Sequence, residues 1–246
     1  MGGRALGGVL FAVLLLGALG LVLLSGSDDP APPPAIEVAT APPPQTSEPA
    51  EPLGARLLRR TQLRASPGGR VVASIGTKTE YRSPRVLAVV ARRDGWIGVL
   101  SEEMPNSRAG WIPADSAVLR YMPYTIEVDL SALRLLVRRD GEVVRRFRVA
   151  VGRPGHETPT GRYAITDTLR VSRAGGPYGC CALALTGRQP NVPQGWTGGD
   201  RIAIHGTNAE DSLGTPASSG CIRANDADMR WMMQRLPVGV QVRIRA

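Results

Sequence analysis

Histidine and cysteine are scarce in this chain of 246 residues, which has two histidines and three cysteines. Three cysteines cannot all pair within one chain, so at least one is expected to be a free thiol. Cys180 and Cys181 are adjacent and lack the C-x-x-C spacing of structural zinc sites, which argues against a metal centre. Because a bond between adjacent cysteines is rare, we expect both to be reduced thiols.

Acidic residues are also too few to balance the basic ones, and the formal net charge is +9. Basic residues outnumber acidic ones in both 53–123 and 124–246, whereas the stretch 25–52 contains acids and no base. This distribution favours a polyanionic neighbour such as wall polymers or lipid head groups. The basic residues are not interleaved with aromatic ones, so we expect no nucleic-acid partner.

The N-terminal region has no charged residue between Arg4 and Asp28. A positive start, an apolar run of about twenty residues and an acidic exit are typical of an export signal long enough to span a bilayer. We interpret 1–27 as an uncleaved membrane anchor, with a cleaved signal peptide as the alternative, and expect the folded part in the cell envelope on the extracytoplasmic face. No cysteine follows the apolar run, which argues against a lipoprotein. Residues 28–53 are proline-rich and predict an extended linker.

The remainder reads as mostly β, in two parts. Residues 54–122 contain short apolar runs at 71–73, 86–90, 96–100 and 111–112, separated by Gly, Pro and polar turns, which predicts a small barrel. Its tryptophans, Trp96 and Trp111, are expected in the barrel core, with stacking on sugar or peptide as the alternative. In 123–246 we expect a β-rich domain with strands at Ile126–Leu130, Leu133–Arg138, Glu142–Val151, Arg162–Thr168, Ala182–Thr186, Arg201–His205 and Val238–Arg245.

Two local signals in the second part are strong. Asp140-Gly141 between two strand patterns predicts a hairpin turn. Asn225, with Asp228 three residues later, predicts the start of the one clear helix. The apolar residues of that helix share one face at helical spacing, which indicates core packing: Met229, Met232, Met233 and Leu236.

The stretch from His205 to Arg223 contains the residues best suited to chemistry. His205 closes an alternating apolar run and is expected at a strand end, and Cys221 follows a Gly/Ser/Pro-rich loop shortly before the helix start. A thiol and an imidazole that meet there can form a thiolate–imidazolium nucleophile. Spacing alone does not establish such a pair.

Two ordered motifs add to this reading. H-G-T at 205–207 followed by S-x-G-C-I-R at 218–223 resembles the active-site signature of the bacterial L,D-transpeptidases, and T-P-T-G-R-Y-A-I at 158–165 is similar to another of their segments. The resemblance covers roughly 124–246. One departure is Ser219, where family members usually have histidine. In the first part, D-G-W-I-G-V-L at 94–100 and G-W-I-P-A-D at 110–115 resemble bacterial Src-homology-3-like domains.

The resemblance implies a cysteine acyltransferase with Cys221 as nucleophile and His205 as base. The ring of His205 needs a hydrogen-bond partner, and a backbone carbonyl of Gly206, Thr207 or Asn208 is the expected one. Main-chain N–H groups around Ser219 and Gly220, together with that of Cys221, are expected to form the oxyanion hole. Arg223 is expected to lower the pKa of the thiol or to hold a substrate carboxylate.

The resemblance also implies the substrate, a peptidoglycan stem tetrapeptide that loses its terminal D-alanine and is joined to a neighbouring stem. Acylation of Cys221 by carbapenems is implied as well, and no cofactor or metal is called for. Three other activities stay open on the residues alone: a sortase-like protein-to-wall transpeptidase, an L,D-carboxypeptidase, and a non-catalytic wall-binding protein.

Overall fold

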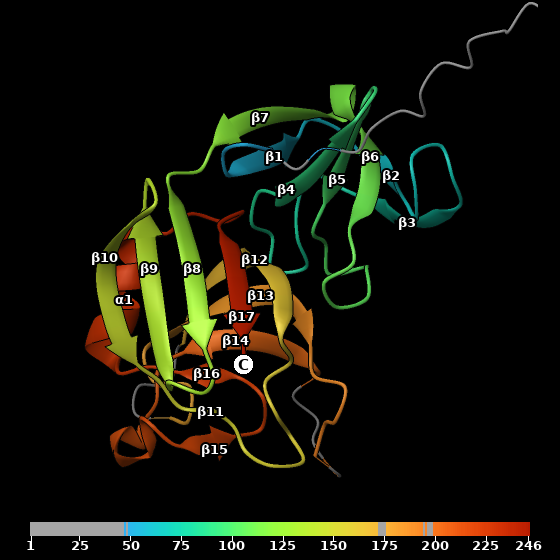
Figure 1. The fold of residues 1–246 in the computed structure, drawn as a ribbon. Helices are drawn as coiled ribbons and strands as arrows, with labels where there is room; N and C mark the ends of the chain where they lie inside the picture. The colour runs from blue at the N-terminus through green and yellow to red at the C-terminus, as the bar shows by residue number, and fades with distance from the viewer. Residues whose placement is uncertain (1–46, 48, 172–175, 194, 196–198) are drawn as a thin grey trace, which may run out of the picture. The chain divides into compact units, whose positions relative to one another are not determined.

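The computed structural model describes residues 47, 49–171, 176–193, 195 and 199–246 (Figure 1). Strands dominate, and one α-helix accompanies them. The predicted membrane anchor and almost all of the predicted linker lie outside the described residues. Within the described part, no helix is long and apolar enough to cross a bilayer.

The first sheet is built from the residues that precede 122. Its seven strands have the order β3-β2-β6-β5-β4-β1-β7. Their bounds are β1 Leu53–Leu57, β2 Thr61–Arg64, β3 Val71–Ile75, β4 Val86–Arg93, β5 Trp96–Val99, β6 Gly110–Pro113 and β7 Ala117–Tyr121, with a short 3-10 turn, η1, at Ala114–Ser116. The strongly apolar strands β3 to β6 follow the predicted runs, whereas β1, β2 and β7 were not predicted.

The two tryptophans of this sheet are half-buried rather than core residues. Their neighbours Ile97 and Ile112 fill the core instead, with exposed fractions of 2% and 0%. Successive strand residues point to opposite faces, so a buried isoleucine places the adjacent Trp96 or Trp111 on the other face. The prediction of a tryptophan core was therefore wrong.

The second sheet carries the candidate site. Its eight strands have the order β10-β9-β8-β17-β12-β13-β14-β16, and β11 pairs with β15 in a separate two-stranded sheet. The bounds are β8 Tyr124–Asp129, β9 Arg134–Arg139, β10 Glu142–Arg148, β11 Val151–Gly152, β12 Gly161–Arg170, β13 Cys181–Arg188, β14 Arg201–His205, β15 Pro216–Ser218, β16 Ile222–Arg223 and β17 Gln241–Arg245, with the 3-10 turn η2 at Glu210–Ser212.

Both strong local signals are confirmed. Asp140 and Gly141 form the turn between β9 and β10 with φ values of 51° and 85°, a conformation that glycine adopts at little cost. The helix α1 spans Asp226–Arg235, and the side chain of Asn225 accepts a hydrogen bond from the Asp228 N–H at 2.8 Å. Two methionines of the predicted apolar face, Met229 and Met232, are fully buried in the main core.

The end of this sheet formed by β14 and β16 positions the functional residues. The two strands are parallel, with Ile204 opposite Ile222 and His205 opposite Arg223. Parallel strands need a connection that crosses back, and here residues 206–221 supply it. The last residue of β14 and the residue just before β16 are thereby brought to adjacent strands.

Candidate active site

His205 and Cys221 line the same pocket. His205 is the last residue of β14, and Cys221 immediately precedes β16 as a half-buried free thiol. The pocket has a volume of about 640 Å³. Its polar lining residues are Tyr81, Arg170, Tyr178, Gln189, Asp200, Arg201, His205, Ser218, Ser219, Cys221 and Arg223. Four of the seven predicted site residues are in this lining, and Gly206, Thr207 and Gly220 are not.

The imidazole of His205 has a fixed orientation. Its Nδ1 lies 2.5 Å from the carbonyl oxygen of Gly206, as expected from the sequence. A carbonyl can only accept, so Nδ1 carries the proton and Nε2 is the basic nitrogen. The ring of Tyr178 packs at 57° to the imidazole with centroids 4.8 Å apart. Tyr178 was not predicted as a site residue, because it reaches His205 from a loop that no motif connects to β14.

Burial controls the charge state of both groups. It lowers the pKa of His205 to about 4, with a further lowering by the charge of Arg223 and opposition from the hydrogen bond to Gly206. Burial also raises the pKa of the Cys221 thiol, although the Ala203 N–H and Arg223 act in the other direction. At neutral pH the resting pair is therefore a neutral thiol and a neutral imidazole. A thiolate–imidazolium pair would therefore form only when the proton is transferred during the reaction.

Arg223 presents its guanidinium to the pocket from β16. Its Nε is buried and has no hydrogen-bond partner within the described part of the chain. A buried guanidinium N–H without a partner is costly, and a substrate carboxylate would satisfy it. The predicted role of Arg223 in holding a carboxylate fits this geometry.

The main chain of the cysteine loop differs from the expected oxyanion hole at Gly220. Its N–H donates to Ser218 Oγ at 3.0 Å, so it is not free to stabilise an oxyanion. Gly220 has a φ of +116°, and a Cβ there would overlap the Gln189 side-chain amide. The glycine is thus required by packing and backbone geometry, and its N–H stabilises the loop through Ser218.

Ser219, at the family's histidine position, has a polar partner of its own. Its Oγ accepts a hydrogen bond from the Arg153 guanidinium at 2.7 Å. Gln189 Nε2 donates to the Ser219 carbonyl at 3.2 Å and to the carbonyls of His156 and Glu157. Arg153 and Gln189 therefore hold the loop that carries the thiol. Neither residue belongs to a motif, so no sequence signal pointed to them.

Gly206 and Thr207 position the histidine rather than line the pocket. A Cβ on Gly206 would overlap the Asp226 carboxylate, so only glycine fits between β14 and the start of α1. Thr207 is 4% exposed, and its Oγ1 accepts from the Ala209 N–H at 3.1 Å. The H-G-T motif thus places the Gly206 carbonyl beside the imidazole Nδ1 at the end of β14.

The other two cysteines correct an expectation. The structure joins Cys180 and Cys181 in a disulfide, where the sequence favoured free thiols. Gly206 N–H donates to the Cys181 carbonyl at 3.0 Å, so this pair lies behind the histidine turn. The second histidine, His156, is a loop residue as predicted, with Nδ1 2.6 Å from the Asn191 carbonyl. Over the described residues, no group of three or more His, Cys, Asp or Glu side chains is placed to hold a metal ion.

Thr158 of the T-P-T-G motif connects that motif to the cysteine loop. Its hydroxyl accepts from the Gly152 N–H and donates to the Gly220 carbonyl, both at 2.9 Å, and the side chain is buried. Replacing a buried hydroxyl by a methyl group leaves both partners unsatisfied.

We expect Thr158→Val to destabilise the domain by about 1–3 kcal/mol, seen as a melting temperature lower by roughly 3–10 °C. Alkylation of Cys221 by iodoacetamide should change in rate as well. The matched control is Thr160→Val in the same motif, where the side chain is exposed. A Thr158→Val variant that melts and reacts like the control would contradict the bridge.

The comparisons with known proteins agree on one family. The model of the L,D-transpeptidase catalytic domain matches residues 123–244. The putative L,D-transpeptidase YkuD of Bacillus subtilis is 30% identical over 151 residues, which cover 59% of this chain and 84% of the relative. The putative L,D-transpeptidase YqjB of the same organism is 35% identical over 131 residues, covering 50% and 70%.

Solved structures give weaker likenesses. An L,D-transpeptidase from Mycobacterium tuberculosis H37Rv is 16% identical with a TM-score of 0.44, covering 80% of this chain and 91% of that one. One from Mycobacterium smegmatis is 18% identical with a TM-score of 0.41, covering 58% and 76%. Because these TM-scores are below 0.5, the assignment depends on the sequence matches. On those matches the chain belongs to the L,D-transpeptidase catalytic domain family and is an enzyme of that class.

Proposed function

We propose that this enzyme cross-links peptidoglycan stem peptides through a thioester on Cys221, with His205 as the base. The observation that carries the proposal is that a free thiol and an oriented imidazole line one pocket. Such a pair converts one difficult amide exchange into two easier acyl transfers. The pocket volume of about 640 Å³ is within the range of small-ligand sites and suits part of a stem peptide.

The proton balance follows from the resting state. As the sulfur of Cys221 attacks the carbonyl carbon of the donor's third residue, the thiol proton passes to His205 Nε2. The imidazolium then gives this proton to the leaving amine, and D-alanine departs. A neighbouring stem's side-chain amine attacks the thioester and loses its proton to Nε2. The imidazolium so formed returns that proton to sulfur, which restores the neutral pair.

Two further groups have proposed roles in binding. The N–H groups of Ser219 and Cys221 are the remaining candidates among the predicted oxyanion donors, since the Gly220 N–H is engaged by Ser218. Arg223 would hold the carboxylate of the donor, for which its unpartnered Nε provides a donor. A positive group beside the scissile amide also stabilises negative charge as it develops.

The rest of the chain would place this activity at the cell wall. We propose an anchor or export signal at 1–27, a linker at 28–53, a Src-homology-3-like domain at 54–122 and the catalytic domain at 123–246. The apolar run, the proline-rich stretch and the seven-stranded first sheet support this division. An extracytoplasmic position follows, since the proposed substrate is there.

The test is to incubate the purified full chain with disaccharide-tetrapeptide and to identify the products by mass spectrometry. We expect a cross-linked dimer and one D-alanine per cross-link. Release of D-alanine with only tripeptide product would indicate a carboxypeptidase, and no turnover at all would indicate a wall-binding protein. Either result would overturn the cross-linking proposal.

A further inference from the structure

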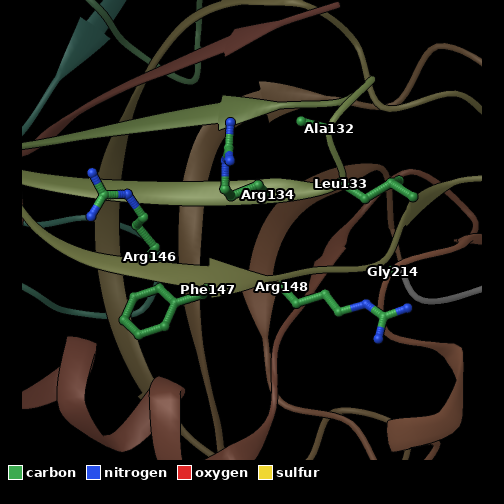
Figure 2. Close-up of a pocket in the computed structure, with 7 residues that line it drawn as sticks. All are labelled: Ala132, Leu133, Arg134, Arg146, Phe147, Arg148 and Gly214. Carbon is green, nitrogen blue, oxygen red and sulfur yellow. The ribbon is translucent and has the colours of Figure 1, made fainter.

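A second hollow lies on the β9–β10 hairpin and shares no lining residue with the Cys221 pocket. It has a volume of about 380 Å³. Its lining residues, drawn in Figure 2, are Ala132, Leu133, Arg134, Arg146, Phe147, Arg148 and Gly214. Three of the seven are arginines and none is acidic. Nothing in the proposed acyl transfer uses this groove.

Two arginines of the groove lie opposite each other on neighbouring strands and repel each other. Arg134 of β9 and Arg148 of β10 are direct cross-strand partners. Like charges opposite each other destabilise a sheet. The same sheet places arginines opposite each other twice more, Arg162 with Arg243 and Arg188 with Arg201. Arg188 and Arg201 form ion pairs with Asp200 at 2.5 Å and with Glu80 at 3.4 Å, whereas Arg134 and Arg148 have no ion pair among the described residues.

The positive charge of the groove is only slightly offset. Arg134 helps to lower the pKa of Asp129, but that carboxylate already accepts from the Ala132 N–H at 2.8 Å and pairs with Arg245. The side chains of Arg146 and Arg148 are exposed, and neither has an ion pair or a hydrogen bond to any residue that the structure describes. Arg146 and Arg148 are therefore available to a ligand, and Arg134 is engaged only through its attraction to Asp129.

The loop after η2 packs closely against the side chain of Arg148. Gly214 has a φ of +81°, and a Cβ there would overlap the guanidinium of Arg148. The Gly214 N–H donates to the Val149 carbonyl at 3.0 Å, which holds the loop against β10. A side chain that is packed before binding loses less entropy when a ligand arrives. The groove is therefore partly organised in advance.

The arrangement fits an extended ligand better than a single anion. Arg146 and Arg148 are two residues apart on one strand, a spacing of about 6.8 Å along the sheet. Figure 2 shows the three guanidiniums spread along the hairpin, while Phe147 points the other way toward α1. They do not converge on one point as they would around one phosphate. Successive charges on a chain can each meet one of them.

We propose that this groove binds a phosphodiester polyanion, a linear polymer with a negative charge in each backbone repeat. The planar guanidinium matches the paired oxygens of a phosphodiester, and the exposed arginines allow the chain to pass through. A concave groove bounded by Leu133 and Gly214 suits a strand of polymer more than a flat bilayer. Three of the basic residues of the chain thereby have a proposed binding role.

The test measures binding of fluorescently labelled poly(glycerol phosphate) to the full chain in neutral detergent, by anisotropy over a range of salt concentrations. The variant is R134Q/R146Q/R148Q. The control is R60Q/R70Q/R120Q, which removes the same charge from exposed arginines within residues 54–122. At about 50 mM salt we expect the groove variant to bind at least tenfold more weakly, with the slope of log K against log salt reduced by about 2. The control should lose less than about threefold.

Three results would overturn the proposal. Equal loss in both triple variants would mean that net charge alone attracts the polymer. Displacement of the polymer by inorganic phosphate at an equal phosphate concentration would mean a single-anion site. If the groove variant lost binding to phosphatidylglycerol vesicles but kept binding to the polymer, the groove would be a membrane-facing surface. Equal melting temperatures of all three proteins confirm that the variants are folded.

Discussion

Replacing Cys221 by alanine is expected to abolish the acyl-enzyme and to lower turnover of disaccharide-tetrapeptide by on the order of 10⁴-fold or more. The sulfur is the only group in the pocket that the proposed mechanism uses as a nucleophile, so nothing remains to carry the acyl group. The side chain is half-buried and small, so the fold should tolerate the change. Intact-mass measurement after incubation with a carbapenem checks the adduct, and product analysis checks turnover.

The matched control replaces the other two cysteines, as C180A/C181A. These residues form a disulfide behind the histidine turn and are not nucleophiles in the mechanism. We expect the adduct to form in this double variant with the stoichiometry of the wild type. An adduct that persists in Cys221→Ala and disappears in the control would show that Cys180 or Cys181, and not Cys221, is the nucleophile.

His205→Gln is expected to slow acylation by about 10²–10⁴-fold, the usual contribution of a general base. Glutamine retains a donor for the Gly206 carbonyl but cannot take the thiol proton. The control is His156→Gln, since His156 is a loop residue outside the pocket lining. Stopped-flow acylation rates should differ from the wild type by less than about threefold in the control. Equal rates in both variants would remove His205 from the mechanism.

The pH profile gives a sharper test of the same residue. Burial lowers the pKa of His205 to about 4, so the imidazole is basic above that value and the acid limb of acylation should lie near pH 4. Because the pKa of Cys221 is raised, the rate should stay flat through neutral pH instead of forming a bell around 6.5. His205→Gln should lack the acid limb. A wild-type limb near 6.5 would mean a solvated imidazole.

Stability should follow the same titration. An unfolded histidine binds its proton near pH 6.5, whereas folded His205 does so only near pH 4. The folded state is thus favoured fully above the first value and loses up to about 3 kcal/mol as the pH falls to the second. Denaturant unfolding of wild type and His205→Gln between these limits measures the difference.

The features that the sequence predicted correctly are local ones. His205 was placed at a strand end by alternation, and the start of α1 was placed by the Asn225 cap, because both patterns are contained in a few consecutive residues. The hydrogen-bond partner of the His205 imidazole was also predicted, since the carbonyl of the next residue, Gly206, lies within reach of Nδ1.

The features that it missed depend on contacts between distant segments. The Thr158 hydroxyl donates to the Gly220 carbonyl 62 residues away. The carbonyls that accept from Gln189 Nε2 are 30 or more residues away. The state of the thiol depends on burial, which the pairing of β14 with β16 creates. Periodicity carries no information about such contacts, so the sequence predicted neither the resting charge state of the pair nor the hydrogen bond from the Gly220 N–H to Ser218.

The most direct measurement is peptide mapping of the acyl-enzyme trapped by rapid acid quench during turnover of the tetrapeptide donor. The account predicts a thioester on the peptide containing Cys221, with a mass increase equal to the donor without its terminal D-alanine. An acyl group on any other residue, or a cross-linked product formed without a covalent intermediate, would contradict it.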